Sequence, residues 1–125
     1  MFAELAFVVA VSAPIQEPPL RRCYEFPEGC RNSDTYLAGQ LPWRGGVGPD
    51  VEYPERAHQA QIPGAVVLDC AVSPENGALG GCRIIEETAG NYGFGAAAVR
   101  AVSRRRLDPG LWTHERVKFR IDFRF

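Results

Sequence analysis

The stretch "RVKFRIDFRF", residues 116–125, carries the clearest structural signal in the chain. From Val117 to Phe125 every second residue is apolar, and charged residues fill the positions between them. A period of two over nine residues predicts a β-strand with one buried face and one charged, solvated face. No residue follows Phe125 in the sequence, so we expect the outer edge of this strand to be uncovered.

A β-hairpin is predicted upstream of this strand. The segment reads "AVVLDCAV", then "SPENGAL", then "GGCRIIEE", and it contains the dipeptide Asn76-Gly77. Asn-Gly between two β-branched runs is the strongest short signal for a two-residue hairpin turn. We therefore expect residues 65–72 and 81–87 to pair as antiparallel strands.

Four cysteines, at positions 23, 30, 70 and 82, are many for a chain of 125 residues. An even number at wide spacings favours two disulfides and an oxidising compartment. Cys70 and Cys82 lie six residues on either side of Asn76, so the hairpin predicts a disulfide between them. Cys23 and Cys30 close a short loop and form the second predicted pair. A zinc site and four free buried thiols are the alternatives that the count leaves open.

Two helices are predicted around the hairpin. The segment "YPERAHQAQIPG", residues 53–64, has a proline near its start and a Pro-Gly pair at its end. The segment "NYGFGAAAVRAVSRRRLDPG", residues 91–110, repeats apolar residues at helical spacing and ends at Asp-Pro-Gly. The order helix, strand, strand, helix, strand predicts an α+β fold, a two-layer sandwich of a three-stranded antiparallel sheet and two helices.

We expect a small core between the predicted sheet and the predicted helices. Its members come from the alternate positions of the strands and from the apolar helix face. The predicted core residues are Leu107, Phe119, Val66, Leu68, Ile84 and Ala98. Trp43, Tyr53 and Trp112 are candidates for stacking on a peptide or for packing in the core, and packing is the favoured reading.

The chain before residue 51 has a different composition. Residues 1–13, "MFAELAFVVAVSA", hold a short apolar run followed by small residues, as in a secretion signal, although Glu4 stands where a basic residue is usual. A buried strand or helix is the alternative for this leader. Residues 14–50 hold six of the ten prolines and no sustained period, so we expect a loop or linker. The folded domain is predicted over residues 51–125.

Several function classes are disfavoured by the sequence. A net charge of −1 gives no electrostatic case for nucleic acid, and the arginines at 104–106 suit a solvated helix end. The G-x-G-x-x-A at residues 93–98 lacks the second parallel strand and acidic residue of a dinucleotide site. His58 and His114 lie far from any metal-ligand spacing, and no serine has a neighbouring base motif. We expect no enzyme activity, no cofactor and no metal.

Residues 53–125 resemble the C-terminal domain of the TonB family. "YP" opens a short helix, and "SPENGAL" stands at the family's hairpin turn, often written D-x-x-G-x-[VL]. An alanine-rich helix leads to "RRRLDPG", in the place of the family's R-[RW]-[RW]-[FY]-x-P-G, and an alternating strand ends in Arg-Phe. The cysteine pair and "GFGAAAV" resemble a subgroup in which both hairpin strands carry a cysteine.

The resemblance implies a function in energy-dependent transport across the outer membrane. Proteins of the TonB family work with ExbB and ExbD, and their periplasmic C-terminal domain binds the TonB-box peptide of outer-membrane receptors. The peptide adds as a strand beside the last strand of the domain. A homodimer is also compatible with the resemblance. The implied partner-binding residues are Val117, Lys118, Phe119, Arg120, Ile121, Asp122, Phe123 and Arg124.

Two departures from the family bear on this function. The family's membrane anchor is a helix of about 20 apolar residues, and this sequence contains no such span. The family's long Pro-rich spacer is reduced to residues 14–50. We therefore expect either an inner-membrane-anchored protein whose start is truncated or an exported relative that binds without pulling. The alternative from another class is a structural or scaffolding module of the cell envelope with no link to the motor.

Overall fold

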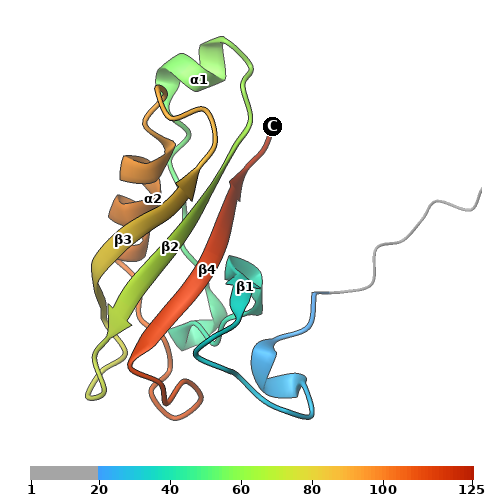
Figure 1. The fold of residues 1–125 in the computed structure, drawn as a ribbon, viewed down its shortest axis with the longest axis vertical. Helices are drawn as coiled ribbons and strands as arrows, with labels where there is room; N and C mark the ends of the chain where they lie inside the picture. The colour runs from blue at the N-terminus through green and yellow to red at the C-terminus, as the bar shows by residue number, and fades with distance from the viewer. Residues whose placement is uncertain (1–19) are drawn as a thin grey trace, which may run out of the picture.

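The computed structural model describes residues 20–125, so the predicted leader at residues 1–13 lies outside the described part (Figure 1). The fold is α+β, as predicted. The strands are β1 (Thr35–Leu37), β2 (Gly64–Val72), β3 (Leu79–Glu87) and β4 (Arg116–Phe123). The helices are α1 (Glu55–Gln59) and α2 (Phe94–Val102), with short 3-10 helices η1 (Cys23–Glu25), η2 (Ala38–Gln40) and η3 (Arg44–Gly46).

The sheet differs from the three-stranded antiparallel sheet that the sequence predicts. It has four strands in the order β1-β4-β2-β3, and β1 runs parallel to β4 while the other pairs are antiparallel. The prediction missed β1 because three residues are too few to show a period of two. The expectation of an uncovered β4 edge is also wrong over part of its length, because Tyr36 of β1 lies opposite Phe119 (Figure 1).

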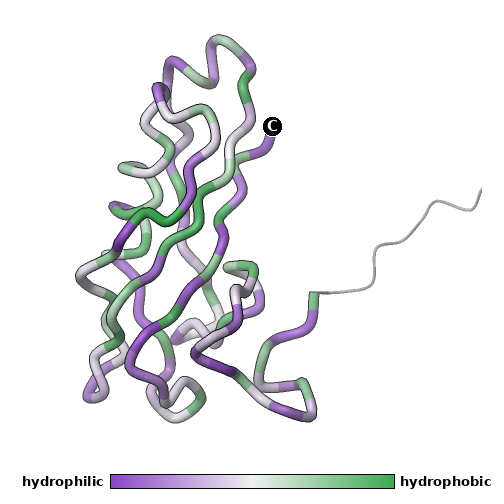
Figure 2. Tube along the Cα trace, in the orientation of Figure 1, coloured by the Kyte–Doolittle hydropathy of each residue, from purple (hydrophilic) through white to green (hydrophobic). Residues whose placement is uncertain are grey.

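The alternation predicted for the last strand is confirmed in β4. The four odd-numbered residues from Val117 to Phe123 are buried, and those between them are exposed or half-buried. Figure 2 shows the resulting alternation of hydrophobic and hydrophilic residues along β4. The helix α2 packs against β2 and β3 and contributes its alanine-rich face to the core, so the sheet has one covered face.

The predicted hairpin is confirmed as β2 and β3, joined by a turn that contains Asn76. Its pairing is interrupted at two places, between Val67 and Leu68 and between Asp69 and Ala71. Each of these two interruptions places an extra residue on β3, as in a β-bulge.

The hairpin turn also contacts a distant segment, because the Leu107 N–H donates to the Gly77 carbonyl oxygen at 2.9 Å.

Both predicted disulfides are present, and no cysteine in the described residues is free. Cys70 of β2 is joined to Cys82 of β3, with their Cα atoms 4.0 Å apart. Cys23 is joined to Cys30, with a Cα separation of 4.8 Å. The first bond ties the two strands of the hairpin together, and the second closes the loop that precedes β1.

Five of the six predicted core residues are fully buried, namely Leu107, Phe119, Val66, Leu68 and Ala98. The sixth prediction is wrong, because Ile84 is 45% exposed. Ile84 lies on β3, which pairs on one side only within residues 20–125, and its Cδ1 lies near Gly95 at the start of α2. Both tryptophans are buried, as the favoured reading has it, and Tyr53 is half-buried.

Residues 20–50, which the sequence predicts as loop or linker, supply part of this core. Tyr36, Leu41 and Trp43 are buried there. The Trp43 ring meets Phe119 edge to face with centroids 5.7 Å apart. The domain that the structure describes therefore includes residues upstream of the predicted boundary at residue 51.

Candidate functional site

The backbone of β4 faces two ways, and one hydrogen bond fixes which residues face outward. The Val72 N–H donates to the Glu115 carbonyl oxygen at 2.8 Å, so this antiparallel pair is a hydrogen-bonded one. Hydrogen-bonded and non-hydrogen-bonded pairs alternate along an antiparallel ladder. The β4 register with β2 is unbroken from Arg116 to Phe123, so the alternation continues along the strand. The residues of β4 whose N–H and C=O point away from β2 are therefore Arg116, Lys118, Arg120 and Asp122, and Arg124 comes next in the same alternation, one residue past the end of the strand.

The strand β1 occupies the middle of this outward edge. It pairs in parallel with residues 118–120 of β4, which include the outward-facing Lys118 and Arg120. No strand in the described part of the chain pairs with the outer edge at Asp122 or Arg124. Beyond the end of β1, the free edge thus comprises residues 121–124.

Tyr36 anchors β1 in the core. Its side chain is 5% exposed, and its ring meets Trp112 edge to face with centroids 5.9 Å apart. Its hydroxyl accepts a hydrogen bond from the Arg31 N–H at 2.6 Å and donates one to Asp34 Oδ2 at 3.3 Å. Burial raises the pKa of the Tyr36 phenol, while the Arg31 N–H opposes the rise and Asp34 adds to it. Removal of β1 from β4 would therefore expose a buried tyrosine whose hydroxyl is hydrogen-bonded within the fold.

The loop before β1 is fastened to the segment that leads into β4. Cys23 is fully buried, and its disulfide holds Cys30 beside it. His114 Nε2 lies 2.8 Å from the Cys30 carbonyl oxygen, within hydrogen-bond distance. These contacts hold the loop in place next to the sheet, so β1 is a fixed part of the fold.

A charged group lies on the open face of the free edge. Asp122 is placed between Arg120, at 3.0 Å, and Arg124, at 3.4 Å. All three side chains are partly exposed to solvent. Ion pairs of this kind contribute little to stability, so these charges are available for contact with a partner.

An aromatic group, formed by Tyr53, His58 and Phe125, lies on the other face of the same end. Phe125 is 66% exposed, and its ring centroid is 4.8 Å from that of Tyr53 and 5.7 Å from that of His58. Tyr53 also meets the buried Phe123 edge to face at 5.8 Å, and burial raises the pKa of its phenol. The free edge is therefore bordered by charge on one face and by aromatic surface on the other.

The structure separates the eight residues predicted as a partner-binding site into three sets. Val117, Phe119, Ile121 and Phe123 direct their backbone groups to β2 and their side chains into the core. Lys118 and Arg120 pair with β1. Of the eight residues, only Asp122 and Arg124 have backbone groups that point away from β2 and that pair with no strand in the described chain. Sequence reasoning missed β1 and the aromatic group, and only the β-favouring Thr-Tyr pair in "TYL" hints at the former.

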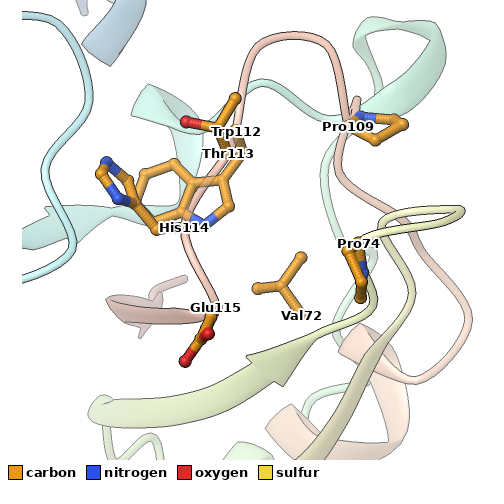
Figure 3. A pocket seen from close by; sticks show the side chains of 7 residues that line it. All are labelled: Val72, Pro74, Pro109, Trp112, Thr113, His114 and Glu115. Atoms are coloured by element: carbon orange, nitrogen blue, oxygen red, sulfur yellow. The ribbon is translucent and has the colours of Figure 1, made fainter.

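A pocket of about 420 Å³ lies at the opposite end of β4 (Figure 3). It forms where the end of β2, the hairpin turn and the segment before β4 meet. Val72, Pro74 and Pro109 give it apolar walls, and Trp112 lies beside them. The pocket is separated from the free edge by the length of β4.

Neither a metal centre nor a membrane helix is found in the part that the structure describes. Among residues 20–125 no group of three or more His, Cys, Asp or Glu side chains is placed to hold a metal ion. No helix among these residues has the length and apolar character needed to cross a bilayer.

Comparison with known proteins identifies the family. The model of the Gram-negative bacterial TonB protein C-terminal domain matches residues 49–125, which span α1, the hairpin, α2 and β4. No curated protein matches the chain significantly. The matched part is more than half of the sequence. The chain therefore belongs to the TonB C-terminal family, whose non-enzymatic periplasmic domains serve energy transduction to outer-membrane receptors.

Proposed function

We propose that this chain binds an extended peptide of an outer-membrane receptor by strand addition at residues 121–124 of the β4 edge. The observation that carries the proposal is the outward backbone of Asp122 and Arg124, which continues the edge already used by β1. Strand addition takes its affinity from main-chain hydrogen bonds and its selectivity from side-chain contacts. The parallel β1 strand supports the proposal, since it is an intramolecular example of a strand added to this edge.

The free edge is short, which limits what the backbone contributes. Two outward residues offer three or four hydrogen bonds, each worth about 1 kcal/mol net, and about 4 kcal/mol corresponds to a Kd near 1 mM. Burial of one apolar partner side chain against the aromatic group adds about 2 kcal/mol. We therefore expect an affinity of tens of micromolar for a peptide that uses both.

Proline substitutions test the backbone mechanism, because proline cannot donate to a strand ladder. Asp122→Pro removes an outward N–H, so we expect it to abolish peptide binding while the fold is kept. Asp122→Ala is the matched control, since it removes the charge and retains the N–H. Ile121→Pro removes an N–H that faces Val66 of β2, so we expect it to destabilise the domain instead.

The measurement is a titration of TonB-box-like peptides into the labelled protein, followed by amide chemical shifts and paired with thermal melts. Shifts that cluster at residues 121–125 and vanish in Asp122→Pro support strand addition. Shifts elsewhere, or equal binding by the Asp122→Pro and Asp122→Ala variants, would show that the edge is not the site.

We further propose that the chain acts in receptor-coupled transport and not as a passive scaffold of the envelope. ExbB and ExbD are partners under this proposal only where the protein is anchored in the inner membrane. Family membership supports the transport role. Cross-linking in cells under non-reducing conditions tests it: recovery of outer-membrane receptors is expected, and recovery of structural envelope proteins alone would favour the scaffold.

A further inference from the structure

One buried side-chain nitrogen in the described residues has no hydrogen-bond partner, and it belongs to Trp112. The side chain is 2% exposed, and its Nε1 is buried without an acceptor. The other tryptophan is a useful contrast, because Trp43 Nε1 donates to the Ala38 carbonyl oxygen at 2.6 Å. A buried donor left without an acceptor costs free energy, so an isolated indole N–H of this kind requires an explanation.

The unpartnered N–H lies beside the pocket at the hairpin end of the sheet. Figure 3 shows the indole nitrogen on the side of the ring that faces Val72. The space in front is about 420 Å³, far more than the roughly 30 Å³ that one water occupies in the liquid. A ligand group larger than water can therefore enter, and because Nε1 is buried it reaches this atom only after a covering side chain turns aside.

The pocket's chemistry selects the ligand. An indole N–H only donates, so its partner must be an acceptor. Glu115 is one of the lining residues and its negative charge disfavours an anion, and no lysine or arginine lines the pocket to compensate. The second polar ring, His114, is already engaged with the Cys30 carbonyl oxygen. Val72 and Pro74 offer apolar contact. A neutral carbonyl next to a small apolar group satisfies all of these features.

We propose that this pocket binds a neutral amide carbonyl with an adjacent small apolar group, held by the Trp112 N–H. The site is independent of the sheet edge, since it lies at the other end of β4. A free small amide and a segment of another protein share this chemistry, and the experiment below separates them. Because a side chain that covers Nε1 must move, we expect weak binding, with a Kd in the millimolar range.

The two indole signals of the ¹⁵N-labelled full chain provide the test. The probe is N-acetyl-proline methylamide, and the anionic control is N-acetyl-proline. We expect the Trp112 indole N–H to shift saturably with the amide, the Trp43 signal to stay in place, and the anion to bind at least threefold more weakly. An unmoved Trp112 signal, or equal shifts of both indoles, would overturn the proposal.

Two variants sharpen the result. Trp112→Phe keeps an aromatic ring and removes the N–H, so we expect binding, followed at the Glu115 amide, to weaken about threefold to tenfold. Trp43→Phe is the matched control and should leave the affinity unchanged. Unchanged affinity in Trp112→Phe would contradict the proposed hydrogen bond, and if that variant does not fold, the wild-type indole shift decides.

A pentapeptide with the same proline at its centre identifies the source of the ligand. Binding at least tenfold tighter than that of the capped residue indicates a protein segment, and equal binding indicates a free amide. Neither result depends on residues 121–124. If the pocket binds no amide, the proposal of strand addition at the sheet edge is unaffected, and if the sheet edge binds no peptide, the pocket proposal is unaffected.

Discussion

The two edges of the sheet are built differently, and the difference shows what makes an edge usable. β4 pairs with β2 in an unbroken register, and it already carries β1 on its outer side. β3 has no strand on its outer side in the described chain, so it is the more open edge. Its pairing with β2 is nevertheless interrupted twice, and Ile84 and Ile85 are 45% and 48% exposed.

The interruptions in β3 change the spacing of its outward backbone groups. Leu68 lies opposite Ile84 and Val67 lies opposite Glu86, so Ile85 is an extra residue on β3. An incoming strand with regular spacing cannot match donors and acceptors on both sides of such a bulge. Regular spacing, and not exposure, therefore distinguishes the edge suited to strand addition. The bulges also protect an exposed apolar edge from unwanted pairing.

The largest expected effect separates the buried face of β4 from the exposed surface of β3. Phe119→Ala should lower the free energy of unfolding by about 3–5 kcal/mol, because the side chain is fully buried. Ile85→Ala on β3 should cost less than about 1 kcal/mol, because its side chain is half exposed. Chemical denaturation of both variants checks this, and similar losses would mean that β3 is covered in solution.

The two disulfides come next. Replacing Cys70 and Cys82 by alanine should cost about 3 kcal/mol in the chain-entropy model, because the bond spans 12 residues of sequence. Replacing Cys23 and Cys30, which are seven apart, should cost about 2.5 kcal/mol. Only the second change should loosen β1, as hydrogen exchange at Tyr36 would reveal. Equal hydrogen exchange at Tyr36 in both variants would show that the loop closed by Cys23 and Cys30 does not hold β1 in place.

Tyr36→Phe tests the anchoring of β1 more gently. Loss of the hydroxyl leaves the Arg31 N–H without its acceptor, so we expect a loss of about 1 kcal/mol at neutral pH. Burial raises the pKa of Tyr36 above the ordinary value of 10.0, so its contribution is full below pH 10.0 and is lost as the pH rises through the higher, folded-state pKa.

The difference in stability between wild type and Tyr36→Phe should therefore shrink above pH 10.0. Thermal melts from neutral to alkaline pH measure this difference, and phenolate absorbance follows the ionisation itself. Because Tyr53 is unchanged in both proteins, its own raised pKa cancels from the comparison. A constant difference across the range would place Tyr36 in solvent.

The smallest effect on stability concerns exposed arginines on the two edges. Arg120→Glu and Arg83→Glu each disrupt a partly exposed ion pair, with Asp122 and Asp69 respectively. We expect each to change stability by less than about 0.5 kcal/mol. Peptide titrations should show changed selectivity for Arg120→Glu alone, since Arg83 lies on the bulged edge. An equal change in both variants would point to long-range charge and not to contact.

Much of the fold follows from local patterns in the sequence. The alternation in β4, the Asn-Gly turn and the alanine-rich face of α2 are each visible within one segment, and all three are confirmed. β1 could not be predicted in this way, because a three-residue parallel strand depends on a partner more than 80 residues away. Ile84 was misplaced for a related reason, since its exposure depends on where the sheet ends.

The candidate site was only partly predictable. The sequence predicts an uncovered outer edge for the last strand, which is correct only beyond the end of β1, and it cannot tell which residues face outward. Whether the even-numbered or the odd-numbered residues of β4 face outward depends on the pairing of Val72 with Glu115. The length of β4 that stays unpaired depends on where β1 ends. The aromatic group was also out of reach, because it joins Tyr53 and Phe125 from opposite ends of the matched domain.

The contact between Gly77 and Leu107 has a consequence for the order in which the chain folds. A Cβ at Gly77 would lie 1.8 Å from the Leu107 carbonyl oxygen, so the turn and the segment after α2 touch backbone to backbone. Leu107 in turn forms a bridge with Trp43. A turn that looks local in sequence is thus completed only by residues thirty positions later. We expect the hairpin tip to form late, after the rate-limiting step, with φ-values near zero for substitutions in the turn.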